Sequence, residues 1–223
     1  MLSLIPAFND SLFGSSDIDF SIDLLELGVD SVMNDGILRE IPIVSTLVGA
    51  SKLIIKIREY NFLKQTFTFI EAVRSGSISP EELKRYHERL ETNPKRVKEE
   101  LSRVLVFLDR FTDEKKSRLL ALIYLALVRE QVSWDDFFEL SEIVDRLFSS
   151  DIQLLEKLDF DSETIIQREG NHAAERLIAI GLLTNYEERS EDGKHVRNLS
   201  ITQTPLILSS LGKLFCKCCL MNN

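Results

Sequence analysis

Residues 39–59, REIPIVSTLVGASKLIIKIRE, are the most apolar part of the chain and lie between charged flanks. Their apolar residues recur at alternating steps of four and three, the spacing of a helix with one apolar face. Lys52 and Lys56 lie on the other face, and a lysine near the middle of a membrane span costs about 2.5–3.5 kcal/mol. We therefore expect an amphipathic helix over residues 41–57 that packs into a protein core. Its predicted inward residues are Ile43, Val44, Leu47, Val48, Ala50, Ile54, Ile55 and Ile57.

The same segment admits a second interpretation. An amphipathic helix over residues 43–57 can also lie on a membrane surface or insert into it conditionally. A membrane-active effector is therefore kept as an alternative. A permanent membrane span is disfavoured, because 17 residues with two internal lysines are at the lower edge of the length that crosses a bilayer.

Composition narrows the class of protein. The chain of 223 residues is 44% hydrophobic and 28% charged, which is typical of a globular protein, and its nine glycines and five prolines are few, which favours helices over β-structure. The net charge is −9. Nucleic-acid binding depends on lysine and arginine that neutralise phosphates, so this charge disfavours nucleic acid as the main partner.

The chain is expected to be mainly α-helical and to fall into three segments. Residues 1–16 are predicted to be a flexible N-terminus, and residues 17–160 a multi-helix bundle. Residues 161–223 are predicted to form a tail with a β-hairpin at about 184–202, since Asp192-Gly193 lies between two extended runs. Pro205 is expected to open a last helix.

Helix starts within the bundle carry local signals. Ser79, Pro80 and Glu82 have the spacing of a capping box, in which serine and glutamate each bond the other's backbone amide. Ser133 and Asp136 repeat the spacing at the start of a later helix. These signals favour separate helices with defined ends.

The tail contains IGLL at 180–183, EDGK at 191–194, SIT at 200–202 and SSLGKLF at 209–215. In this order it resembles the second half of a winged-helix domain of the MarR type. The resemblance implies a recognition helix followed by a wing, and hence a DNA-binding regulator as an alternative function. The residues that it places at nucleic acid are Asn171, His172 and Arg176 on the helix and Arg189, Lys194, His195 and Arg197 on the wing.

The charges around that predicted wing oppose DNA binding. Glu187, Glu188, Glu191 and Asp192 lie beside its basic residues, and residues 162–223 carry seven acids and seven bases. A wing that meets phosphates needs an excess of positive charge. We therefore expect no tight binding of duplex DNA by the tail.

The three cysteines, Cys216, Cys218 and Cys219, lie together near the C-terminus. An odd, clustered set is not a disulfide framework, and it fits a reducing cytoplasm. Three thiols with no nearby histidine do not make a zinc site. Cys216 and Cys219 are three residues apart and are expected to pack on one buried helix face as small apolar residues.

No arrangement typical of a catalytic site, metal site or nucleotide loop is found in the sequence, so we expect a non-enzymatic protein without a cofactor. His87 lies among charged residues and is expected at the surface. Trp134, Phe137 and Phe138 form an aromatic group on one short helix. Such a group usually belongs to a core, but part of it is a candidate contact with a protein partner.

Two further features suggest a biological setting. An early IPIVSTLVG segment and a later LIAIGLL segment before a terminal helix resemble uncharacterised bacterial proteins of the abortive-infection alpha group. The resemblance implies an accessory role in phage defence and supplies no catalytic residues. The leading hypothesis is a cytoplasmic helical interaction protein that acts through a protein partner or as a homo-oligomer.

Overall fold

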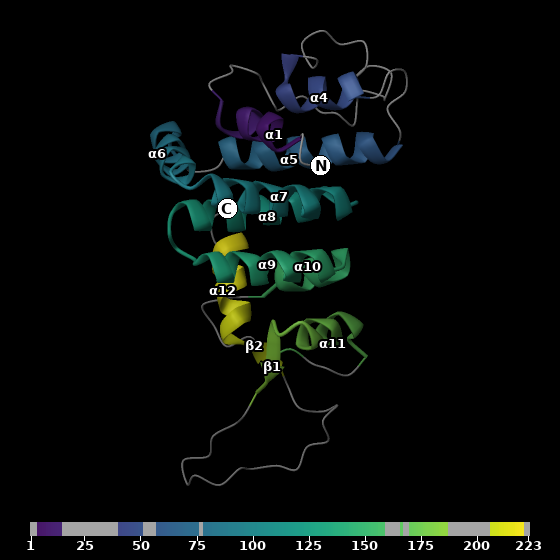
Figure 1. Ribbon diagram of the computed structural model, residues 1–223. Coiled ribbons are helices and arrows are strands. Elements are labelled where there is room, and N and C mark those ends of the chain that lie inside the picture. Colours follow the sequence, from purple (N-terminus) through teal and green to yellow (C-terminus); the bar gives the residue numbers. More distant parts are fainter. Residues whose placement is uncertain are drawn as a thin grey trace. The chain divides into compact units, whose positions relative to one another are not determined.

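The computed structural model describes residues 4–14, 40–50, 57–75, 78–158, 166, 170–186 and 206–220. These residues form ten helices and a two-stranded antiparallel sheet, so the predicted mainly α-helical class is confirmed (Figure 1). Among the described residues, no helix is both long enough and apolar enough to cross a membrane. The elements are α1 (Leu4–Phe13), α4 (Pro42–Ala50), α5 (Ile57–Ser75), α6 (Pro80–Glu91), α7 (Pro94–Arg110), α8 (Glu114–Val128), α9 (Trp134–Arg146), α10 (Ser149–Leu155), α11 (His172–Ala179), β1 (Leu183–Asn185), β2 (Leu206–Leu208) and α12 (Ser210–Cys219).

The chain divides into two compact units, residues 1–141 and residues 142–223. The division falls within α9, earlier along the chain than the start of the predicted tail at residue 161. The first unit holds α1 and α4 to α8 together with the start of α9. The second unit holds the end of α9, helices α10 to α12 and the small sheet.

An aromatic cluster forms the centre of the first unit. Tyr124 of α8 is fully buried, and its ring lies 5.6 Å from Phe69 of α5 and 6.0 Å from Phe137 of α9. Phe8 of α1 joins them at 6.0 Å from Phe69. Each fully buried side chain of this size contributes about 1.5–3 kcal/mol by leaving water, so four helices share one core.

Leu4–Phe13 form the helix α1, which corrects the flexible segment predicted for residues 1–16 over this range. Phe8 and Leu12 of α1 are completely buried, and the backbone amide of Ile43 donates to Ser11 Oγ at 3.2 Å. The prediction failed because polar residues in this segment mask an apolar face that another helix covers. Tertiary packing, rather than helix propensity, supplies most of the stability of a short helix.

The apolar stretch around α4 lies partly in the core, as predicted. Ile41, Ile43 and Val44 are buried. Ile57, however, belongs to the start of α5 and is 86% exposed, which corrects its predicted inward position. Residues 51–56, which include the predicted inward residues Ile54 and Ile55, lie outside the described residues.

The predicted capping boxes are confirmed. Ser79 Oγ accepts from the Glu82 amide at 3.2 Å, and Glu82 accepts from the Ser79 amide at 3.0 Å. Ser133 and Asp136 make the same reciprocal pair at the start of α9. These starts depend only on residues three apart, which is why sequence alone locates them.

The second unit contains a sheet that pairs part of the predicted first hairpin strand with a segment predicted to be helical. Strand β1 pairs antiparallel with β2, with Leu183 opposite Leu208. The sequence predicts a helix that Pro205 opens and that includes residues 206–208, but the last helix, α12, begins only at Ser210. Gly212 of α12 lies against the backbone of Leu182, where a Cβ atom would be 2.1 Å from the carbonyl oxygen. Residues 187–205, with the predicted turn and second strand, lie outside the described residues.

Candidate functional site

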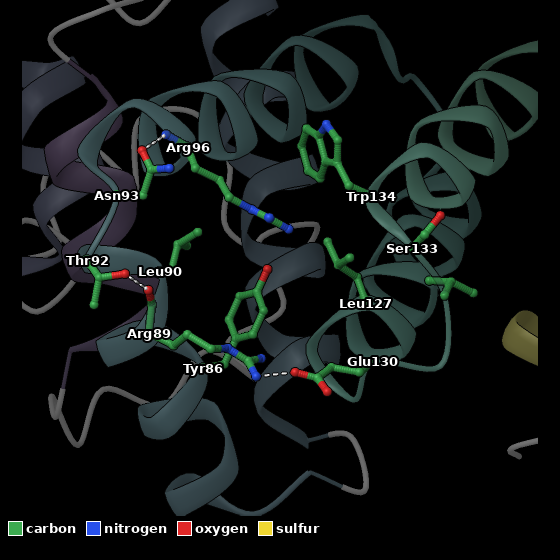
Figure 2. Close-up of a pocket in the computed structure, with 11 residues that line it drawn as sticks. Tyr86, Arg89, Leu90, Thr92, Asn93, Arg96, Leu127, Glu130, Ser133 and Trp134 are labelled. Atoms are coloured by element: carbon green, nitrogen blue, oxygen red, sulfur yellow. Dashed lines mark hydrogen bonds and ion pairs between the residues drawn. The ribbon is translucent and has the colours of Figure 1, made fainter.

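A pocket of about 440 Å³ opens in the first unit between α6, the start of α7 and the turn that joins α8 to α9 (Figure 2). Its volume is within the range of small-ligand sites, about 300–1,000 Å³. Leu90, Leu127 and Val132 give it a buried apolar base. Its polar and charged residues are Arg89, Thr92, Asn93, Arg96, Glu130 and Ser133.

A buried carboxylate lies behind the pocket wall. Glu100 of α7 is fully buried and accepts the hydroxyls of Tyr86 and Tyr124 at 2.8 Å and 2.9 Å. Burial raises the pKa of Glu100, and the two hydroxyl bonds and the charge of Arg96 act in the opposite direction. The pKa of Tyr124 is raised by burial and by the neighbouring carboxylate. This network joins α6, α7 and α8, and it positions Tyr86 as a pocket wall.

The two arginines of the pocket differ in their partners. Arg89 of α6 forms an ion pair with Glu130 and lies 5.5 Å from the centre of the Tyr86 ring. Arg96 of α7 lies 5.8 Å from the centre of the Trp134 ring. Figure 2 shows its side chain extending across the pocket toward Trp134. Within the part of the chain that the structure describes, no carboxylate forms an ion pair with Arg96.

Glu130 holds an unusual backbone conformation at the edge of the pocket. Its φ is 59°, a left-handed value that favours glycine, and it follows the C-terminal end of α8. Such conformations persist where the surrounding structure enforces them, and they are common at functional sites. Here the conformation belongs to the residue that faces Arg89.

The pocket offers mainly hydrogen-bond donors. Several of its polar groups form hydrogen bonds within the protein. Thr92 Oγ1 donates to the Arg89 carbonyl, and Asn93 Oδ1 accepts from the Arg96 amide. Ser133 Oγ donates to Asp136. Its carboxylate, that of Glu130, accepts from Arg89. The guanidinium of Arg96 therefore remains as a donor group directed into the space.

The aromatic group predicted as a partner contact is divided between core and pocket. Phe137 is fully buried in the aromatic cluster, which corrects its predicted role, because its position on α9 faces Tyr124. Phe138 is half-buried under Arg103, whose guanidinium carbon is 3.9 Å from its ring centre. Trp134 is half-buried and lines the pocket.

Of the residues predicted at nucleic acid, the structure describes Asn171, His172 and Arg176. Arg176 of α11 pairs with Asp151 of α10, donating Nε at 3.0 Å and Nη2 at 2.5 Å to one carboxylate oxygen. Asp151 is fully buried, and Arg176 also covers the ring of Phe148. Moving Arg176 to a phosphate would leave a buried carboxylate without its cation. The other four residues, Arg189, Lys194, His195 and Arg197, lie outside the described residues.

The thiols are buried, as predicted. Cys216, Cys218 and Cys219 of α12 are each less than 5% exposed. Burial raises the pKa of Cys216 to about 12 and that of Cys219 well above its ordinary value. Such thiols remain protonated and unreactive at neutral pH. In the described ranges, no group of histidine, cysteine and acidic residues is arranged to hold a metal ion.

His87 corrects the prediction of a solvated surface residue. Its ring stacks on Phe13 with centroids 4.2 Å apart, and its Nε2 lies 3.1 Å from Asn9 Oδ1. The side chain is 19% exposed. Helix α1 covers this histidine, so the error has the same cause as the missed N-terminal helix.

Sequence reasoning missed the pocket and the network behind it. One signal for the network was present: Glu100 precedes Leu101 and lies four residues before Val104, so it shares their apolar helix face. A carboxylate on such a face needs buried donors. The donors, Tyr86 and Tyr124, are identified only by the fold.

No protein-family model matches the chain, and no similar protein is found among curated proteins or among solved structures.

Proposed function

We propose that this protein is a non-enzymatic helical interaction protein and that a protein partner enters the pocket between α6, α7 and the α8–α9 turn. The observation that carries the proposal is the guanidinium of Arg96. It is directed into an accessible pocket, and within the described residues no carboxylate pairs with it. Arginine and tryptophan together are typical of the residues that dominate binding energy at protein interfaces.

A binding role fits the chemistry of the pocket better than a catalytic one. Both oxygens of Glu100 receive hydroxyl bonds from within the protein, and Glu100 itself does not line the pocket. A general acid or base must reach the proton that it transfers. The hydroxyl of Tyr86, which lines the pocket, donates to Glu100. It is therefore engaged within the protein.

The resemblance to the abortive-infection alpha group favours phage defence as the setting of this interaction. The setting is tested separately from the pocket, by comparing phage plaque formation on host cells with and without the gene. A defence role predicts fewer or smaller plaques when the gene is present. It also predicts that the difference disappears when Arg96 is replaced by glutamine.

The partner proposal is tested by site-specific photo-crosslinking in the native host. We replace Thr92, an exposed pocket residue, with the photoreactive p-benzoylphenylalanine. The matched control carries the same group at Lys98, which is exposed on α7 and does not line the pocket. We expect one defined protein to be attached at position 92 and not at 98. No adduct at position 92, or equal adducts at both, would reject the partner proposal.

A further inference from the structure

The chemistry of the partner segment follows from the charge of the pocket. The charged residues that line the pocket, Arg89, Arg96 and Glu130, sum to one net positive charge, although the whole chain carries −9. A local positive site on an acidic protein attracts anions and repels like-charged surfaces, which gives specificity. The expected ligand group therefore carries negative charge and accepts hydrogen bonds.

We infer that the pocket binds an acidic peptide segment of the protein partner, with a carboxylate side chain held by Arg96 against Trp134. This inference rests on the proposed function and names the chemistry that it requires. The guanidinium is a planar fork of N–H groups that matches the two oxygens of a carboxylate. The face of Trp134 stabilises the cation while the N–H edges stay available to the ligand.

A second hollow supports a peptide rather than a small free anion. A neighbouring depression of about 270 Å³ shares Tyr86, Arg89 and Glu130 with the pocket. Its additional charged residues are Arg85, Arg129 and Glu82, which add one net positive charge. The Arg89–Glu130 ion pair thus lies between two adjoining hollows. An extended chain with acidic residues can occupy both, and one of its carboxylates can replace Glu130 as the partner of Arg89. Glu130 is 67% exposed at its side chain, so this exchange costs little desolvation.

The start of α7 argues for a carboxylate rather than a phosphate. Phosphate sites at helix starts use several free backbone amides. Here Pro94 has no amide proton, and the amide of Arg96 is bonded to Asn93 Oδ1. A phosphate dianion would find one net positive charge in the pocket and no row of amides, whereas a carboxylate needs only the fork of Arg96.

The inference is tested by selecting peptides from a displayed random library on the immobilised full-length protein. Three forms are compared: the native protein, Arg96→Gln, and the control Lys98→Gln, which removes the same charge from the same helix outside the pocket. We expect aspartate and glutamate to be enriched on the native protein and on Lys98→Gln, and not on Arg96→Gln. Selected peptides should bind Arg96→Gln about tenfold or more weakly, the loss expected for a charge-assisted hydrogen bond.

Trp134 provides an independent signal, because it is the only tryptophan in the chain. Selected acidic peptides should change its fluorescence, and the same peptides with asparagine and glutamine in place of their acids should not. Inorganic phosphate and phosphoserine are titrated in parallel. No enrichment, enrichment without acidic residues, equal enrichment on Arg96→Gln, or a response to phosphate alone would each overturn the inference.

The two proposals fail in different ways. If position 92 captures a partner in cells and Arg96→Gln leaves that capture unchanged, a partner binds here without the carboxylate contact, and only the present inference is lost. If acidic peptides bind as expected but no protein is captured, the pocket recognises acidic segments and the partner proposal is the one rejected.

Discussion

Arg96 in the first unit and Arg176 in the second both lie over an aromatic ring, but they differ in their ion-pair partners. Each lies over an aromatic ring, Arg96 at 5.8 Å from Trp134 and Arg176 at 4.8 Å from Phe148. Arg176 also holds the buried carboxylate of Asp151. The buried carboxylate near Arg96, that of Glu100, is instead occupied by two tyrosine hydroxyls.

This difference separates a structural arginine from one available for binding. The charge of Arg176 compensates a carboxylate that folding has removed from water, so its loss should affect stability. Arg96 forms no ion pair among the described residues, and its charge acts on Glu100 without a direct bond, so its loss should affect binding more than stability. Measurements of stability alone can therefore test whether Arg176 and Arg96 differ in this way.

The largest expected effect is the contrast between Arg176→Met and Arg96→Met. Methionine keeps an unbranched side chain against the aromatic ring and removes the charge. Arg176→Met leaves Asp151 buried without its cation, so we expect the melting temperature of the transition that includes the second unit to fall by more than about 5 °C. Arg96→Met should lower the melting temperature by less than about 2 °C. Thermal unfolding followed by circular dichroism measures both, and equal shifts would remove the distinction.

The next largest effect is expected in the hydrogen bonds that Tyr86 and Tyr124 donate to Glu100. Tyr124→Phe removes one hydroxyl from a buried carboxylate, and we expect the free energy of unfolding to fall by about 1.5–3 kcal/mol, the range for a hydrogen bond to a charged group. Urea unfolding measures this change. In a double-mutant cycle with Glu100→Gln, the two losses should be non-additive, because the residues share one bond. Additive losses would show that the hydroxyl and the carboxylate act separately.

The caps were predictable from sequence because each depends on residues three apart, as Ser79 and Glu82 show. The pocket was not, because its walls come from α6 and from the α8–α9 turn, some 40 residues later in the chain. Nothing in the local sequence of Arg89 indicates that Glu130 will face it. Long-range pairing of this kind is decided by tertiary packing.

The same limit explains the corrected predictions. Pro205 predicts a helix that includes Leu206–Leu208, but pairing with β1 gives the backbone of these residues other partners. Short apolar runs of this kind are ambiguous between strand and helix. Phe137 and Trp134 looked equivalent in sequence, three positions apart on one helix. Only packing against Tyr124 separates the core residue from the pocket residue.

A smaller effect is a pH dependence from Glu100. Because burial raises its pKa above the ordinary value of 4.5, the folded protein binds a proton that the unfolded chain has released. Stability from this group is therefore present below about pH 4.5 and is lost as pH rises through the folded pKa. Urea midpoints should show this decline in the native protein, and the difference from Glu100→Gln should isolate it. A difference that is flat with pH would contradict the raised pKa.

The smallest effect is expected at a third arginine, Arg103, which lies 3.9 Å from the ring centre of Phe138. Like Arg96, it comes from α7 and covers an aromatic residue of α9, but Phe138 does not line the pocket. Arg103→Met should lower the free energy of unfolding by about 0.5–1 kcal/mol, the value of a cation–π contact at an exposed site. It should leave acidic peptide binding within about twofold of the native protein, whereas Arg96→Gln weakens it about tenfold. Fluorescence titration at Trp134 compares the two variants directly. If Arg103→Met weakened peptide binding as strongly as Arg96→Gln, an arginine over an α9 aromatic would be sufficient for the effect, and the pocket would lose its special role.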